Sequence, residues 1–168
     1  MDNPSAPPAS SVRSSTDRRS LLVIGGVTTA LASSHLADHV LRGRHVDQAH
    51  LDPTWNHSGW PFTSNVTPFT FSLVLVLSIL LGGLLLTARG KAWAGYWLGA
   101  SMVLGAIVTV VHFVPTANQE SPAVIYGSWP DQPVIGALAV ALTFAIVGVL
   151  VLMGVNAVRV RRRSGSWK

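Results

Sequence analysis

The chain of 168 residues has the length of one domain, and 49% of its residues are hydrophobic while only 11% are charged. Because the apolar residues gather in long runs, this composition excludes an ordinary soluble domain and indicates a membrane protein. The formal net charge of +5 does not indicate nucleic acid, since the basic residues flank the apolar runs, and the absence of cysteine excludes disulfides, thiolate metal sites and iron–sulfur clusters.

Four segments are long and apolar enough to cross a membrane: about 21–41, 69–88, 92–114 and 134–158. A helix needs roughly 20 mainly apolar residues to cross the hydrocarbon core, and it satisfies its backbone polar groups within its own segment. The sequence therefore predicts an all-α fold, a polytopic membrane protein whose four-transmembrane-helix bundle occupies residues 21–158.

Basic residues predict the orientation of this bundle. They cluster before the first span, between the second and third spans, and after the fourth: Arg13, Arg18, Arg19, Arg89, Lys91, Arg159, Arg161, Arg162, Arg163 and Lys168. By the positive-inside rule these clusters and both termini are cytoplasmic, and only Arg42 and Arg44 oppose this orientation. Residues 1–20 are predicted to be a disordered cytoplasmic tail and residues 159–168 a basic cytoplasmic tail. Because Arg outnumbers Lys, with abundant Ala, Val and Gly, we expect a bacterial cytoplasmic membrane.

The first span has a second interpretation as a cleaved export signal. The run Asp17-Arg18-Arg19-Ser20-Leu21-Leu22 is similar to a twin-arginine signal, and Ala30-Leu31-Ala32 fits a cleavage site. Cleavage would leave three spans and a new N-terminus at Ser33. The several later spans favour ordinary insertion and hence four spans.

All six histidines and five of the seven acidic residues fall on the predicted outer side. His35, Asp38 and His39 follow the i, i+3, i+4 spacing that places side chains on one helix face. At about 1.5 Å per residue, His35 lies roughly 9 Å below the outer boundary of the core and His39 lies close to it. His112 lies at the same level in a span of the same direction, so it can meet His39 or Asp38 across the bundle. Ionisable groups inside a membrane usually mark a site.

The first predicted outer loop adds weaker candidate ligands, which are His45, Asp47, His50 and His57. Imidazole and carboxylate ligands suit zinc, copper, iron or manganese. Taken singly, however, histidines in a loop are more often merely solvated. The spacing of the first-span residues, H-x-x-D-H, is not the H-E-x-x-H of zinc proteases.

Three further residue patterns predict helix packing rather than chemistry. Gly95 and Gly99 form a G-x-x-x-G pair, which permits close approach of helices. Asn156, near the inner end of the fourth span, is expected to form a hydrogen bond between helices. Asp38 and Arg42 are spaced as an i, i+4 ion pair, which is a structural alternative to a ligand role for Asp38.

Three stretches of the chain resemble segments of small uncharacterised actinobacterial four-span membrane proteins. They are Asp38-His39-Val40-Leu41-Arg42-Gly43, Trp55-Asn56-His57-Ser58-Gly59-Trp60-Pro61-Phe62 and Asn65-Val66-Thr67-Pro68-Phe69-Thr70. The resemblance covers the first span to the start of the second. It implies a four-span fold and a bacterial origin, and it implies no mechanism.

Three functions remain open at this point. The first is an outward-facing site that binds a transition metal or a haem through His35, Asp38, His39 and His112, for redox or metal-assisted chemistry. In the haem variant, His35 or His39 and His112 are the axial ligands. The second is a non-catalytic accessory or assembly subunit, with a homo-oligomer or a membrane-complex partner, since no known catalytic motif is present. The third is a proton or metal-ion transporter, although the second and fourth spans lack charged residues at mid-depth.

Overall fold

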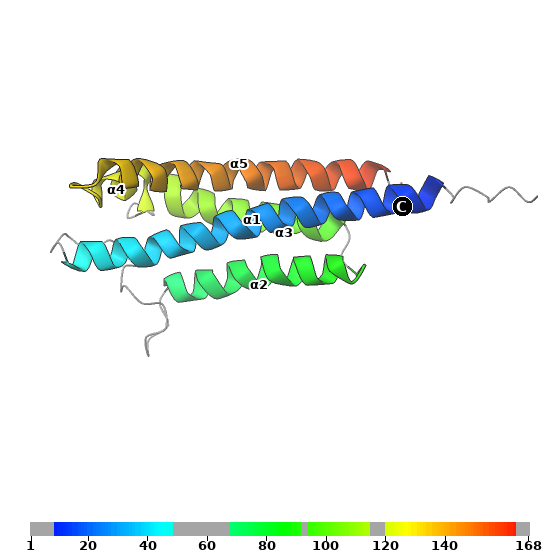
Figure 1. Cartoon of the computed structure of the whole chain (residues 1–168), viewed down its shortest axis with the longest axis horizontal. Helices are drawn as coiled ribbons and strands as arrows, with labels where there is room; N and C mark the ends of the chain where they lie inside the picture. The colour runs from blue at the N-terminus through cyan, green and yellow to red at the C-terminus, as the bar shows by residue number, and fades with distance from the viewer. Residues whose placement is uncertain (1–8, 49–67, 92–93, 115–119, 164–168) are drawn as a thin grey trace, which may run out of the picture.

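A computed structural model of the protein describes residues 9–48, 68–91, 94–114 and 120–163. The helices are α1 (Ala9–Gln48), α2 (Pro68–Ala88), α3 (Ala94–Phe113), α4 (Pro122–Gly127) and α5 (Pro133–Arg163). All but the short α4 are long and apolar enough to span a membrane, which confirms the predicted all-helical fold with four candidate spans. They alternate in direction, so that α1 and α3 run one way and α2 and α5 the other (Figure 1).

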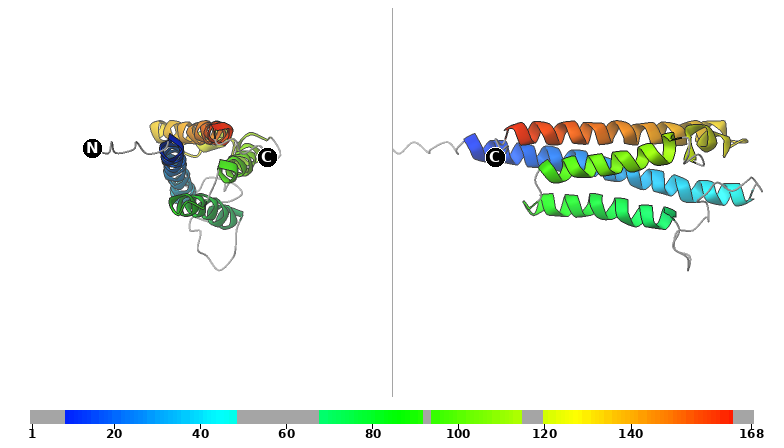
Figure 2. Two further views of the ribbon diagram at one scale, coloured as in Figure 1. Left: turned by 90° about the vertical axis from the view of Figure 1, so that its right-hand side faces the viewer. Right: turned by 180° about the vertical axis from the view of Figure 1, so that it is seen from behind.

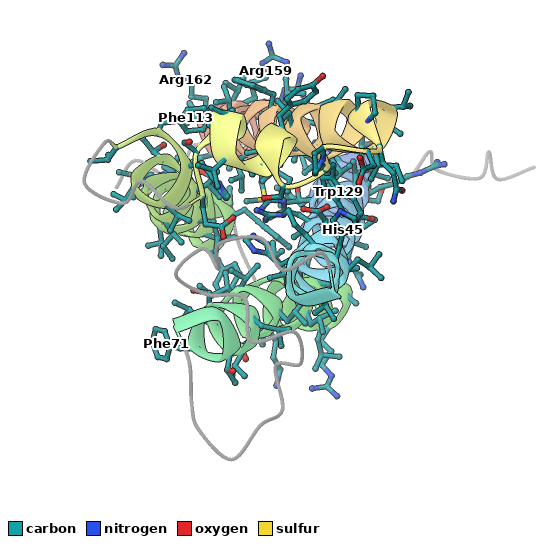
Figure 3. All side chains as sticks on the ribbon, turned by 90° about the vertical axis from the view of Figure 1, so that its left-hand side faces the viewer. His45, Phe71, Phe113, Trp129, Arg159 and Arg162 are labelled. Atoms are coloured by element: carbon teal, nitrogen blue, oxygen red, sulfur yellow. The ribbon has the colours of Figure 1, made fainter. Side chains whose placement is uncertain are left out.

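The four long helices are arranged around one axis. Viewed end-on, α5 and α2 lie at opposite corners, with α1 and α3 between them (Figure 2). Large apolar side chains cover the outer faces, and Phe71, Met102 and Val134 are each more than 60% exposed. Figure 3 shows Phe71 pointing away from the bundle. Such faces imply contact with lipid, because a helix exposes apolar side chains where its surroundings are apolar.

Trp97 of α3 holds three helices together near one end of the bundle. Its ring is fully buried against Gly25 of α1 and Gly83 of α2. A Cβ atom at Gly25 would lie 2.5 Å from the ring, and one at Gly83 would lie 3.0 Å from it. The indole Nε1 donates a hydrogen bond of 2.8 Å to Thr87 Oγ1. Glycine is thus required at residues 25 and 83, because the ring of Trp97 occupies the space that a side chain at either position would need.

The predicted close approach at the G-x-x-x-G pair is wrong for Gly99 among the described residues. This glycine is exposed, and a Cβ atom there would meet no atom within 4 Å. The structure makes its close helix contacts at Gly25, Gly83 and Gly154 instead. Spacing alone did not reveal this, because it does not fix which helix face turns inward.

Two helices extend beyond the predicted spans. α1 begins at Ala9, so residues 9–20 are helical rather than disordered, and α5 continues through the basic segment to Arg163. Polar contacts join these extensions: Ser20 Oγ donates to Asn156 Oδ1 at 2.8 Å, and Arg163 lies 3.5 Å from Asp17. The predicted interhelical hydrogen bond of Asn156 is confirmed. Because extending an existing helix costs little, such contacts suffice to order polar sequence.

Both the start of α1 and the end of α5 lie at one end of the bundle (Figure 1). This arrangement agrees with termini on the same side of a membrane. Which side that end faces stays a prediction from the basic residues.

We predict that Gly25→Ala destabilises the bundle while Gly26→Ala does not. The added methyl group at residue 25 would overlap the rigid ring of Trp97, and overpacking of this kind costs about 1–3 kcal/mol. Gly26 is a matched control on the same helix, since a Cβ atom there meets nothing within 4 Å. Thermal unfolding midpoints in detergent measure both effects, and equal midpoints for the two variants would contradict the packing of Trp97.

Candidate metal centre

Three histidines meet at the end of the bundle opposite the termini. His35 and His39 lie one turn apart on α1, and His112 lies in the last turn of α3. All three side chains are buried. His35 Nε2 lies 3.1 Å from His112 Nε2 and 3.1 Å from His39 Nε2, and one ligand atom from each residue lies within 4.8 Å of the others. We call these residues the three-histidine cluster.

The tautomer of His112 follows from its partner. Its Nδ1 lies 2.6 Å from the backbone oxygen of Glu120. A carbonyl oxygen can only accept, so Nδ1 carries the hydrogen and donates it. In the neutral ring, the Nε2 of His112 therefore presents its lone pair to the cluster. A ring nitrogen fixed in this way is typical of metal-bound histidines, whose other nitrogen donates to a carbonyl or carboxylate.

His35 cannot satisfy both of its neighbours by ordinary hydrogen bonds. A single atom, Nε2, makes the contacts with His39 and with His112. In a neutral imidazole this atom has either one hydrogen or one lone pair, and neither can form two linear hydrogen bonds. A cation bound by the three lone pairs would satisfy all three nitrogens at once.

The nitrogen separations fit a small ion. Zinc lies about 2.0–2.1 Å from an imidazole nitrogen, so two such ligands at the tetrahedral angle are about 3.3–3.4 Å apart. The two shortest separations in the cluster, each 3.1 Å, are close to that value. The widest separation, up to 4.8 Å, requires a small inward movement of one ring.

A fully buried ion pair lies beside the cluster. Arg42 donates from Nη2 to Glu120 Oε2 at 2.8 Å, and neither side chain is exposed. Arg42 also donates from Nε to Asp38 Oδ2 at 3.3 Å, which confirms the predicted Asp38–Arg42 ion pair. These two carboxylates and one guanidinium together carry one more negative than positive charge. The cluster thus has a net charge of −1 beside it, with the Arg42 guanidinium in contact with His39.

His39 Nδ1 has a carboxylate and a guanidinium as neighbours. It lies 3.7 Å from Glu120 Oε2 and 3.3 Å from Arg42 Nη2. A guanidinium can only donate, so in the contact of 3.3 Å Nδ1 is the acceptor, and the hydrogen of the neutral ring is on Nε2, directed at His35. Metal binding through Nε2 would require the other tautomer, in which Nδ1 carries the hydrogen and Glu120 Oε2, 3.7 Å away, is the nearby acceptor.

The start of α4 fixes the position of Glu120. Ser121 is the N-cap of this helix and accepts a hydrogen bond of 3.3 Å from the Val124 nitrogen, and Pro122 occupies the first turn. Ile125 is fully buried, and α4 packs against α5. Glu120 directly precedes this capped helix start. Its backbone carbonyl thus accepts from His112, and its carboxylate accepts from Arg42.

Sequence reasoning missed α4 and the role of Glu120. Two signals were present: Glu120 is the single glutamate of the chain, and Ser121-Pro122 is a typical start of a helix. Arg42 was recognised as a charge on the predicted outer side, but not as the partner of a distant carboxylate.

The other predicted site residues do not join the three nitrogens. Asp38 pairs with Arg42. His45 lies within α1 rather than in a loop, and its ring stacks on Trp129 with centroids 4.5 Å apart (Figure 3). Asp47 also belongs to α1, and its side chain is not described. His50 and His57 lie outside the described residues.

Comparisons of the chain with models of protein families, with curated proteins and with solved structures find no match. The resemblance to small actinobacterial membrane proteins stays a prediction.

We predict strong coupling between Arg42 and Glu120. Glu120→Gln keeps the backbone carbonyl but leaves the buried guanidinium without its carboxylate partner at 2.8 Å, and Arg42→Met leaves the carboxylate without its cation. Breaking a buried ion pair costs about 3–5 kcal/mol, whereas replacing both partners costs less than the sum of the single changes. Free energies of unfolding in detergent for both single variants and the double variant test this.

Asp131→Asn is the control for this comparison of single and double variants. Asp131 is exposed, so its substitution should change the free energy of unfolding by less than about 0.5 kcal/mol. Additive effects of the Arg42 and Glu120 changes would show that the pair does not act as a unit.

Proposed function

We propose that the protein is a multi-pass protein of a bacterial cytoplasmic membrane that binds a transition-metal ion through His35, His39 and His112. The observation that carries this proposal is the convergence of three buried imidazole nitrogens, two pairs of them 3.1 Å apart. Imidazole is a common ligand of zinc, copper and iron. With cytoplasmic termini, the site lies at the outward-facing end of the bundle.

A compact ion suits this geometry better than a haem. A porphyrin lies between its two axial ligands, so those ligands cannot touch each other. In the expected pair of His35 and His112, the two Nε2 atoms are in direct contact at 3.1 Å. In the expected pair of His39 and His112, His35 Nε2 lies 3.1 Å from the Nε2 atom of each and occupies the space near both. Either of the expected haem pairs would have to separate its helices to admit the macrocycle.

Three protein ligands are also the number found in catalytic zinc sites, which keep a fourth position for water or substrate. A metal ion bound here would supply Lewis-acid or, for copper, iron and manganese, redox chemistry. The chain contributes two groups next to the ligands: the backbone oxygen of Glu120 orients the ring of His112, and Arg42 contacts His39 Nδ1 while it pairs with the Glu120 carboxylate. We therefore propose metal-assisted chemistry at the outer membrane surface.

The interior of the bundle supports binding at one end rather than passage across the membrane. Below the cluster the core is formed by large apolar side chains such as Leu80, Leu104 and Met153. The buried hydroxyls of Thr28 and Thr143 donate to carbonyl oxygens of their own helices. In the described part of the chain, no chain of polar groups joins the two ends.

The first test is elemental analysis of the full chain, purified in detergent without a polyhistidine tag. We expect about one zinc, copper, iron or manganese ion per chain in the unmodified protein. His35→Ala/His112→Ala should remove it, because two of three ligands are lost. His45→Ala is the matched control, since His45 lies at the same end of the bundle but stacks on Trp129.

Metal retained equally by the double variant and by the control would place the ion elsewhere. If neither the unmodified protein nor the variants bind metal after incubation with each ion, the proposed function is wrong. A role as an accessory subunit would then be favoured, and a stoichiometric membrane partner should co-purify.

A further inference from the structure

A second polar region lies at the other end of the bundle, between α1 and α5. A cavity of about 480 Å³ opens there, within the range of ligand sites. Polar groups of its lining include Arg19 and Ser20 on α1 and Asn156 and Arg159 on α5, and apolar groups include Val23 on α1 and Leu152 on α5.

Polarity changes along the cavity in the same way on both helices. On α1, Val23 lies one turn deeper in the span than Arg19. On α5, Leu152 lies about two turns deeper than Arg159. A molecule entering from the membrane surface therefore meets two guanidinium groups first and an aliphatic surface below them. A phospholipid presents its groups in this order, with the phosphate above the acyl chains.

The two arginines of the cavity are available for an anion. Both Arg19 and Arg159 are exposed, and no carboxylate of the described residues lies within ion-pairing distance of either. Their neighbours are engaged elsewhere, since Arg163 pairs with Asp17 and Arg18 donates to the backbone oxygen of Ala88. The cavity thus has uncompensated positive charge.

Asn156 adds a hydrogen-bond donor to this lining. Its Oδ1 accepts from Ser20, while its Nδ2 is buried without an acceptor among the described residues. A buried amide hydrogen without a partner is costly, and a phosphate or ester oxygen would satisfy it.

We propose that this cavity binds one anionic phospholipid. Arg19 and Arg159 contact the phosphate, and the acyl chains lie along Val23 and Leu152. Basic pockets between membrane helices bind lipid head groups in this way, and arginine is suited to phosphate because its donors match the oxygens in pairs. The aliphatic wall favours a lipid over free phosphate, since a soluble anion gains nothing from apolar contact. This site is independent of the three-histidine cluster.

The test uses the full chain in a mild, non-ionic detergent, with native mass spectrometry to count retained lipids. Dioleoylphosphatidylglycerol is the anionic probe and dioleoylphosphatidylcholine the zwitterionic one. We expect the unmodified protein to retain one molecule of phosphatidylglycerol and little phosphatidylcholine. Arg19→Gln/Arg159→Gln should weaken phosphatidylglycerol binding roughly thirtyfold, because two cationic contacts are lost.

The control is Arg89→Gln/Arg162→Gln, which removes the same charge from exposed residues at the same end that do not line the cavity. Figure 3 labels Arg162 beside Arg159 on α5, so the control is a stringent one. We expect it to retain phosphatidylglycerol as the unmodified protein does. Equal losses in the two double variants would show diffuse attraction to the basic surface and overturn the proposal.

Two further results would also overturn it. One is equal retention of the two lipids. The other is that inorganic phosphate stabilises the protein against unfolding as much as phosphatidylglycerol does. Val23→Trp, which keeps both arginines, tests the cavity by filling it and should also reduce phosphatidylglycerol retention. Metal content should be unchanged in all of these variants, so a failure here is distinguishable from a failure of the metal site.

Discussion

The buried ion pair between Arg42 and Glu120 is the interaction on which the geometry of the three-histidine cluster depends. Removing either charge from water costs several kcal/mol, so each is tolerated because the other lies 2.8 Å away. The pair ties α1 to the segment that begins α4. Since the same Glu120 also accepts a hydrogen bond from His112, one residue sets the relation of α1, α3 and α4 and orients the imidazole of His112.

A second constraint acts on the helices below the site. Trp97 fits against glycines of α1 and α2, which brings three helices into close contact. Because α1 and α3 run in the same direction, this packing also places His35 of α1 beside the last turn of α3, where it meets His112, while α1 continues beyond the end of α3 (Figure 1). Sites built on rigid helices keep their geometry better than sites on loops. The apolar bundle thus serves as the scaffold for a polar site that could not form on either helix alone.

The two ends of the bundle favour ligands of opposite charge. At the three-histidine cluster, imidazole nitrogens converge and two carboxylates accompany one guanidinium, which is the setting proposed above to bind a cation. At the cavity between α1 and α5, two arginines lack carboxylate partners among the described residues, so an anion is favoured. The interior between them is apolar, and its buried threonine hydroxyls bond to their own helices. The described side chains at the two ends therefore differ in the charge of the ligand that we propose for each.

The sequence by itself determined the four candidate spans and the shared face of His35 and His39, because both depend on local properties: the length of an apolar run and the period of a helix. It also predicted that His112 could meet the histidine face of the first span, with His39 or Asp38 as its expected partner. Only the tertiary structure decided that His112 meets His35, that Glu120 pairs with a residue of α1, and that Gly25 rather than Gly99 makes the close contact. Those outcomes depend on the rotation of each helix about its axis and on contacts between distant segments, which no local pattern encodes.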